Sequence, residues 1–337
     1  MKLFSNLWAS IVVLLMLSLA TSCENSSALP EQPEHEYVTV SLGLNVELDC
    51  EYESLTRAED NRDLYGIQVY SSPISATENA QWTKYAYGLF DTSDNLAIKL
   101  IRGYEYKFVA TIVKDGKDKI LYKEVFKTYG DPFRHENSSG GYDMTLLSMS
   151  FIYGQVGMGL EYRSYELGNG HVSHANVDRY YGELEGYIPG DNDSNVTIEL
   201  KRTSFGAKYK VAGEYAENGT LEILMDDAPQ LNLNLAESNE VSDIYSFDDV
   251  RAAWLDENYT ETIPVSLRIA YSDGTTAPLG THNITFKRNT TTVVNVDLTV
   301  SGENGLGFVI TEEGEMPEDS EITIKDGEIV DTEIEAN

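Results

Sequence analysis

Cysteine and positive charge are both scarce in this sequence. Only 2 of the 337 residues are Cys, so a framework of several disulfides is excluded and the fold must be held by its own core. Lys and Arg number 24 against 56 Asp and Glu, which gives a formal net charge of −32. Because so acidic a surface repels phosphate, we expect no nucleic acid as a partner and no binding to anionic lipid headgroups.

Motifs of catalysis, nucleotide binding and metal binding are missing too. There is no G-x-S-x-G nucleophile elbow, no phosphate loop and no dinucleotide fingerprint. The segment 191–195 (Asp-Asn-Asp-Ser-Asn) alternates oxygen side chains like a calcium loop, but Val196 and Arg202 stand where an EF-hand needs Gly and Glu. His171 and His174 lack a third ligand at a recognised spacing, and we expect both to be exposed in a loop. We therefore predict no enzyme: no catalytic residues, no cofactor and no metal site.

The N-terminus has the features of an export signal. Lys2 precedes an apolar run from Ile11 to Leu17, which is too short to span a bilayer, and small residues then lead to Cys23. The segment 19–23 (Leu-Ala-Thr-Ser-Cys) resembles a bacterial lipobox, although its leucine stands four places before the cysteine instead of three. We predict a lipoprotein signal peptide over 1–22 and lipidation of Cys23. An ordinary signal peptide with an incidental cysteine is the alternative.

Beyond the anchor, the chain changes from a tether to strands. Residues 23–36 are rich in Asn, Ser, Glu and Pro and predict a flexible tether, and Cys50 is interpreted as a half-buried strand cysteine. Apolar residues then fall at period two, which predicts a half-buried strand over Tyr37–Asp49. They are Val38, Val40, Leu42, Leu44, Val46 and Leu48. Further strands are predicted at Leu64–Tyr70, Lys84–Phe90, Ala97–Leu100, Tyr104–Val113 and Lys119–Phe126, with a hairpin turn at Lys114–Lys117.

Many short strands separated by turn residues indicate an all-β fold of two antiparallel Ig-like or transthyretin-like β-sandwich domains in tandem. A stretch rich in Gly, Ser and Asn at 130–141 is expected to separate an N-terminal sandwich, 37–135, from a C-terminal one, 142–311, before an acidic tail, 312–337. One helix is predicted within Phe247–Leu255, capped by Asp248 or Asp249. The later strands are predicted at Met144–Tyr153, Leu160–Tyr165, Val196–Arg202, Ala207–Tyr215, Thr220–Met225, Leu231–Leu235, Thr262–Tyr271, Asn283–Lys287, Thr292–Val300 and Leu306–Thr311.

Aromatic residues allow two interpretations. Tyr106 lies in the series L-x-x-G-x-x-Y-x-F-x-A that begins at Leu100, and we predict that it forms a tyrosine corner whose hydroxyl bonds to upstream backbone. Other aromatics could form a sugar-stacking platform on a sheet face, although strand tyrosines more often lie between core and solvent. They are Tyr85, Tyr87, Tyr153, Tyr162, Tyr165, Tyr180, Tyr181, Tyr187, Trp82 and Trp254.

Three short motifs, together with the lipobox, carry a family resemblance. They are Leu55-Thr56-Arg57-Ala58 after the first long strand, the run Ile198–Thr203 continuing to Lys208, and Asp178–Glu183 (Asp-Arg-Tyr-Tyr-Gly-Glu). The whole plan resembles that of fimbrillin-like pilus subunits and accessory adhesins, surface lipoproteins of Bacteroidota.

The resemblance implies assembly by strand exchange. A protease would cut after Arg57, leave Ala58 as the new N-terminus and remove the first strand, and a strand of another pilus or surface subunit would fill the groove. The implied location is the outer membrane or a fimbrium, with membrane contact only through the lipid and a host protein or glycan as a further partner. A solvated loop residue is the alternative for Arg57, and a surface glycan-binding lipoprotein is the alternative function.

Overall fold

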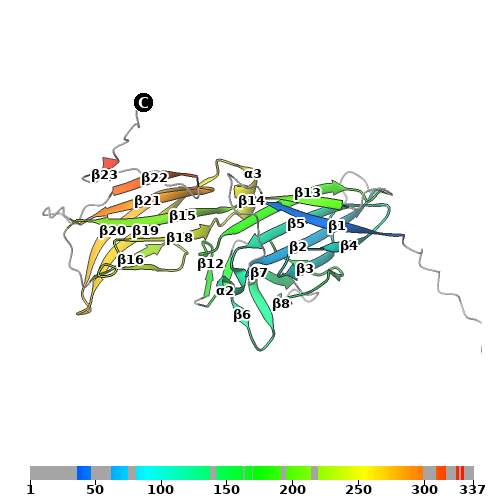
Figure 1. The fold of residues 1–337 in the computed structure, drawn as a ribbon, viewed down its shortest axis with the longest axis horizontal. Helices are drawn as coiled ribbons and strands as arrows, with labels where there is room; N and C mark the ends of the chain where they lie inside the picture. The colour runs from blue at the N-terminus through cyan, green and yellow to red at the C-terminus, as the bar shows by residue number, and fades with distance from the viewer. Residues whose placement is uncertain are drawn as a thin grey trace, which may run out of the picture. The chain divides into compact units, whose positions relative to one another are not determined.

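The computed structural model describes residues 36–46, 62–74, 81–136, 142–161, 164–168, 170–190, 195–213, 219–298, 309–315, 324–325 and 328–329. The all-β class is confirmed, because strands make up nearly all of the regular structure (Figure 1). None of the helices within these ranges is long and apolar enough to cross a membrane. The predicted signal peptide, most of the tether, and Cys23, Cys50, Arg57 and Ala58 lie outside the described residues.

The first region, residues 37–202, is built on one eight-stranded sheet. In spatial order its strands are β4 (Ala97–Ile101), β1 (Tyr37–Val46), β14 (Asn195–Arg202), β13 (Arg179–Tyr187), β5 (Tyr104–Val113), β2 (Leu64–Pro73), β3 (Thr83–Phe90) and β9 (Ile152–Tyr153).

This sheet folds over on itself around an apolar core. Strands β4, β1 and β14 form one wall, and β5, β2 and β3 supply the facing side chains. The two walls join where β14 pairs with β13 over only two residue pairs, Tyr180 with Arg202 and Tyr181 with Lys201. The alternation of buried and exposed residues along β1, β4 and β14 places every second side chain in this core, as period two requires.

A second layer covers the opposite face of β5, β2 and β3. It consists of β6 (Tyr122–Lys123), β7 (Thr128–Glu136), β8 (Tyr142–Leu146) and β10 (Gly157–Met158), with the short helix α2 (Gly116–Lys119) and the hairpin of β11 (Tyr165–Leu167) and β12 (Gly170–Val172) nearby. Phe133 and Leu160 lie so close to Gly66 that a Cβ there would come within 2.9 Å of both side chains. Gly66 therefore allows the layers to approach.

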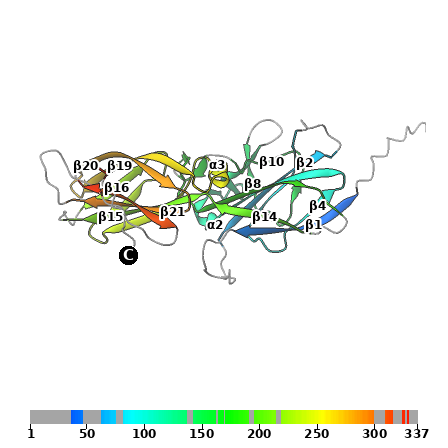
Figure 2. The ribbon, with the colours of Figure 1, turned by 90° about the horizontal axis from the view of Figure 1, so that it is seen from above.

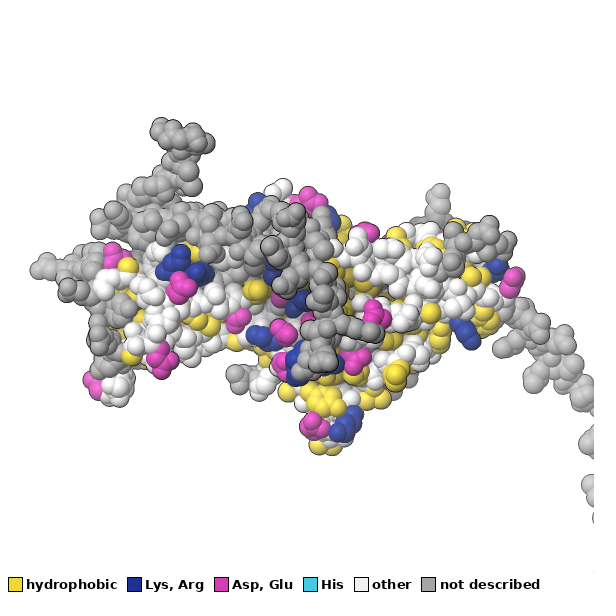
Figure 3. All heavy atoms as spheres, in the orientation of Figure 1, with side chains coloured by type: hydrophobic (Ala, Val, Ile, Leu, Met, Phe, Trp, Pro, Cys, Tyr) yellow, Lys and Arg dark blue, Asp and Glu magenta, His cyan; other side chains and the backbone are white. Residues whose placement is uncertain are grey.

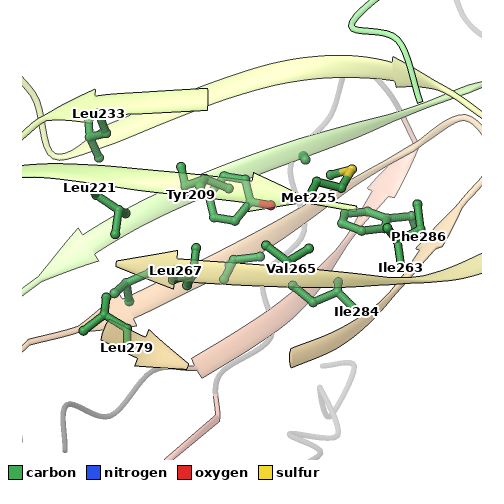
Figure 4. Packing of buried hydrophobic residues seen from close by; sticks show 14 of the residues in the cluster. Tyr209, Leu221, Met225, Leu233, Ile263, Val265, Leu267, Leu279, Ile284 and Phe286 are labelled. Atoms are coloured by element: carbon green, nitrogen blue, oxygen red, sulfur yellow. The ribbon is translucent and has the colours of Figure 1, made fainter. Parts of the chain in front are cut away.

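The second region, residues 204–315, is a sandwich of two four-stranded sheets. One sheet has the order β18 (Glu240–Ser246), β15 (Ser204–Ala212), β21 (Thr290–Asp297), β22 (Val309–Glu315), and the other has β17 (Leu231–Asn234), β16 (Gly219–Met225), β19 (Thr260–Tyr271), β20 (Thr276–Lys287). Their inner faces meet in one core, where Tyr209 of the first sheet lies among Leu221 and Val265 of the second (Figures 2 and 4). The helix α3 (Val250–Leu255) is confirmed, and Asp249 caps it by accepting a 3.0 Å hydrogen bond from the Ala252 N–H. A final pair, β23 (Ile324–Lys325) and β24 (Glu328–Ile329), follows.

Several boundaries differ from those the sequence predicted. The stretch 130–141 begins inside β7, and the chain returns to the first sheet as β13 and β14 before the second region starts at Ser204. The predicted boundary at 130–141 therefore does not separate the sheets. Residues 312–315, expected in an acidic tail, continue β22. Asp115 adopts φ 51° but leads into α2 instead of a tight hairpin.

Candidate functional site: strand β1 and its neighbours

Strand β1 lies between two other strands of the folded sheet. It pairs in parallel with β14, so that Leu42 stands opposite Val196 and Leu44 opposite Ile198. On the other side the Leu42 N–H donates a 2.8 Å hydrogen bond to the Leu96 carbonyl, next to β4. Both backbone edges of β1 therefore take part in the sheet, whereas an edge strand would use only one.

The side chains of β1 divide into an inner and an outer face. Val40 and Leu42 are 0% and 4% exposed and lie in the core between the two walls. Val38, Leu44 and Val46 are half-buried against the same core, which confirms the period-two prediction. The outward side chains are exposed. Fully burying a Val or Leu side chain contributes about 1.5–3 kcal/mol, so two inner residues dominate the side-chain contribution of β1.

Strand β4, the outer neighbour of β1, is also held by tyrosine hydroxyls. The Tyr106 hydroxyl accepts from the Ile101 N–H at 2.7 Å and donates to the Ile101 carbonyl at 3.0 Å, which confirms the tyrosine corner. At Lys99 the Tyr153 hydroxyl accepts from the N–H at 2.8 Å, and the Tyr85 hydroxyl donates to the carbonyl at 2.7 Å. We call Tyr85, Tyr106 and Tyr153 the tyrosine clamp.

The rings of the tyrosine clamp reinforce one another. Tyr85 lies edge-on to both partners, with ring centroids 5.2 Å from Tyr106 and 5.6 Å from Tyr153. The clamp therefore ties β4 to β3, β5 and β9 independently of β1. Without β1, the apolar residues of β4 and β14 would face an open slot whose two backbone edges lack a partner. The residues that line this slot are Leu96, Ile98, Leu100, Val196, Ile198 and Leu200.

Two of the described aromatic residues, Tyr165 and Tyr181, lie in the core of the first region and not on an exposed sheet face. Tyr165 and Tyr181 are buried and pack against the guanidinium of Arg179, which is itself fully buried. That guanidinium donates to the Tyr165 hydroxyl at 2.7 Å, to Thr111 Oγ1 at 2.9 Å and to the Leu160 carbonyl. The Asp-Arg-Tyr-Tyr motif thus contributes a central buried arginine to the first region.

The two histidines lie in different environments. His171 is exposed as expected, but the prediction that His174 is exposed is wrong, because only 8% of its side chain is accessible. Its Nε2 lies 3.0 Å from Glu261 Oε1, and its Nδ1 lies 3.1 Å from the Asp226 carbonyl. Within the described ranges no group of three His, Cys, Asp or Glu side chains is arranged to hold a metal ion. Residues 191–194, whose side chains alternate like those of a calcium loop but which were not predicted to bind a metal, lie outside these ranges.

Acidic and basic side chains intermingle over the face seen in Figure 3, and neither sign forms a continuous patch among the coloured atoms. Several charged side chains of the described residues are paired, for example Arg202 with Asp178 at 2.7 Å and Lys123 with Glu166 at 2.5 Å. The coloured part of this face therefore shows no concentration of one charge sign that would attract a strongly charged partner.

Among known proteins, only solved structures are similar to this chain, and the similarity is one of fold. No protein-family model matches the chain, and no curated protein matches it in sequence. Among solved structures it is similar to a candidate adhesin of Bacteroides ovatus, with 10% identity and a TM-score of 0.39, over 88% of this chain and 98% of that one. It is also similar to a candidate adhesin of Bacteroides thetaiotaomicron, with 15% identity and a TM-score of 0.37, over 82% and 96% of the two chains. The fimbrial anchor protein Mfa2 of Porphyromonas gingivalis shares 8% identity at a TM-score of 0.34, over 81% and 96%.

Proposed function

We propose that the protein is a non-enzymatic cell-surface lipoprotein, a pilus subunit or accessory adhesin, that assembles by exchange of strand β1. Lipidation at Cys23 would hold it at the outer membrane, and cleavage after Arg57 would free β1 from the rest of the chain. The observation that carries the proposal is the position of β1, the first described strand, between β4 and β14.

The contacts of β1 suit a removable strand. Val40 and Leu42 fill the slot, and the outer face is exposed, where Asn45 Nδ2 donates a 2.6 Å hydrogen bond to Glu199 Oε2. The tyrosine clamp holds β4 from its other side, so the slot keeps both walls when β1 leaves. A slot that keeps its shape lowers the entropic cost of binding, because less of the protein has to be ordered when the incoming strand binds.

A donor strand in the slot would meet the backbone groups of β14 on one side and of β4 on the other. Every second side chain of the donor would point into the apolar core. Parallel pairing such as that of β1 with β14 is slightly less stable per residue than antiparallel pairing. Because β1 lies between β14 and β4, a donor of the opposite direction would change both of these pairings, and the slot offers backbone groups to a donor of either direction. Its main-chain bonds would give affinity, and its alternate apolar side chains would set the register.

Nicking the native protein with trypsin tests the proposal. Cleavage after Arg57, followed by loss of β1, should produce ordered association detectable by light scattering, because the open slot exposes apolar residues of two strands. A synthetic peptide of Tyr37–Val46 added in trans should block that association. A variant with both Arg57→Gln and Arg62→Gln, which leaves trypsin no site between β1 and β2, should stay monomeric after the same treatment.

Peptide variants separate slot binding from a general effect of added peptide. Val40→Asp with Leu42→Asp should abolish the block, since an unpaired carboxylate cannot enter the apolar slot. Thr39→Asp with Ser41→Asp adds the same charge to the exposed face and should leave the block intact. A nicked protein that stays monomeric and keeps its melting temperature would show that β1 is not a removable strand.

A further inference from the structure

A small hollow opens on the sheet face opposite the β1 core. Its floor comes from three adjacent strands, with Tyr70 from β2, Lys107 and Val109 from β5, and Tyr181 and Glu183 from β13. The side of the hollow is lined by Arg251, Trp82 and Glu161. Arg251 belongs to α3, which packs beside β13 (Figure 1), and Trp82 lies just before β3. The hollow encloses about 170 Å³. Pockets for drug-sized ligands measure roughly 300–1,000 Å³, so this one suits a ligand of about one ring.

The polar side of the hollow is fixed by Glu183, whose side chain is only 8% exposed. Its carboxylate accepts hydrogen bonds from the Tyr181 hydroxyl at 2.7 Å and from Arg251 Nε at 2.7 Å, and it lies 2.7 Å from Lys107 Nζ. Burial by itself would raise the pKa of Glu183, but these three donors together hold that pKa below its ordinary value. The carboxylate is therefore ionised and held in one position.

The cations that surround Glu183 keep donors for a ligand. A guanidinium has five N–H groups and an ammonium has three. Glu183 accepts from Nε and Nη2 of Arg251, and Lys107 Nζ contacts Glu183 and, at 3.6 Å, Glu185. Since half of the Arg251 side chain is exposed, its remaining donors can reach a hydroxyl in the hollow.

The other side of the hollow is aromatic. Trp82 and Tyr70 are half-buried, so part of each ring is accessible from the hollow. Aromatic faces attract the C–H groups of an apolar ligand surface, and a fixed set of charged hydrogen-bonding groups orients a polar rim. A sugar ring has both features, because one face presents C–H groups and the rim presents hydroxyls.

From this arrangement we infer that the hollow binds one neutral saccharide unit, stacked on Trp82 with its hydroxyls held by Lys107, Arg251 and Glu183. A neutral ligand is favoured because two cations, Lys107 and Arg251, balance two anions, Glu161 and Glu183. None of these residues belongs to β1, β4 or β14, so this site goes beyond the proposed strand exchange and can fail or succeed independently of it.

Saturation-transfer NMR on the full chain, in a detergent without a sugar headgroup, tests the inference. The probes are the methyl glycosides of glucose, galactose, mannose, fucose and N-acetylglucosamine, with methyl glucuronide as the charged comparison. At least one neutral glycoside should bind saturably in the millimolar range expected of a ligand this small, with transfer strongest to one ring face. Saturable binding to none of them, or glucuronide binding tenfold tighter than every neutral probe, would overturn the inference.

Variants place the binding in this hollow. Trp82→Ala should weaken it at least tenfold, and Trp82→Phe, which keeps an aromatic face, should recover part of the loss. Phe126→Ala removes an exposed aromatic ring that does not line the hollow and should change nothing. Equal binding by Trp82→Ala and the unmodified protein would refute the site, and unchanged melting of both Trp82 variants would show that the loss is not unfolding.

Discussion

The described strands of each region include a parallel pair, β1 with β14 in the first and β15 with β21 in the second, and the two pairs are held in different ways. Strand β15 of the second region pairs in parallel with β21 and antiparallel with β18. Its buried residues include Phe205 and Tyr209, both 0% exposed, and Phe205 lies within stacking distance of Phe286, 4.5 Å between ring centroids. Strand β1 instead buries only Val40 and Leu42 fully. The same pairing geometry thus occurs in a strand with several fully buried side chains and in one with two.

Truncating one core residue in each parallel strand tests this difference. Phe205→Ala should lower the free energy of unfolding of the second region by about 3–5 kcal/mol, because it removes a ring packed against Tyr245, Phe247 and Phe286. Leu42→Ala should lower that of the first region by about 2 kcal/mol, at the low end for such changes. Hydrogen exchange of the backbone amides, measured separately in β15 and in β1, gives the two losses of unfolding free energy. A larger effect at Leu42 than at Phe205 would contradict the comparison.

Removing one hydroxyl of the tyrosine clamp should have a smaller effect. Tyr106→Phe leaves the Ile101 N–H and carbonyl without their partner and should cost about 1–2 kcal/mol, seen as faster hydrogen exchange in β4. Tyr153→Phe removes one bond at a more exposed position, to the Lys99 N–H, and serves as the matched control at about 0.5 kcal/mol. If the two variants behaved alike, Tyr106 would not be the principal member of the clamp.

The sequence predicted best where local pattern decides the structure. The alternation from Val38 to Val46, the strand Tyr104–Val113, the corner at Tyr106 and the cap at Asp249 are confirmed, because each depends on residues within a few positions of one another. Strands β13 and β18 were missed. They carry Arg179, Glu183 and Asp243 among their apolar residues, so no clear alternation marks them.

The candidate sites depend on contacts that the sequence does not reveal. The hollow combines residues of three strands and a helix, and only Trp82 and Tyr181 stood out among the aromatics. The burial of His174 depends on Glu261, 87 positions later in the chain. Similarly, the return of β13 and β14 to the first sheet is set by pairing with β5 and β1, which turn residues at 130–141 cannot show.

His174 joins the two compared regions through a polar contact. It precedes β13, and its partners are Glu261 of β19 and the carbonyl of Asp226 in the turn after β16. Burial lowers the pKa of His174, but the hydrogen bond and charge of Glu261, the Asp226 carbonyl and the charge of Asp248 outweigh burial and raise that pKa above its ordinary value. The protonated imidazole therefore stabilises the folded contact between the regions.

The smallest expected effect is a pH dependence of that contact. Because the folded protein binds the His174 proton more tightly than the unfolded chain, the stabilisation is complete below about pH 6.5 and is lost as pH rises through the folded pKa. The free energy of unfolding of the unmodified protein minus that of His174→Gln, measured by urea denaturation across this range, should therefore fall with rising pH. His282→Gln is the control with the opposite sign, because burial lowers the pKa of His282. The free energy of unfolding of the unmodified protein minus that of His282→Gln should rise with pH over the interval between the folded and unfolded pKa values of His282. A His174 difference that is flat or rises with pH would show that the imidazole is neutral in the folded protein, and that the contact between the regions does not depend on its charge.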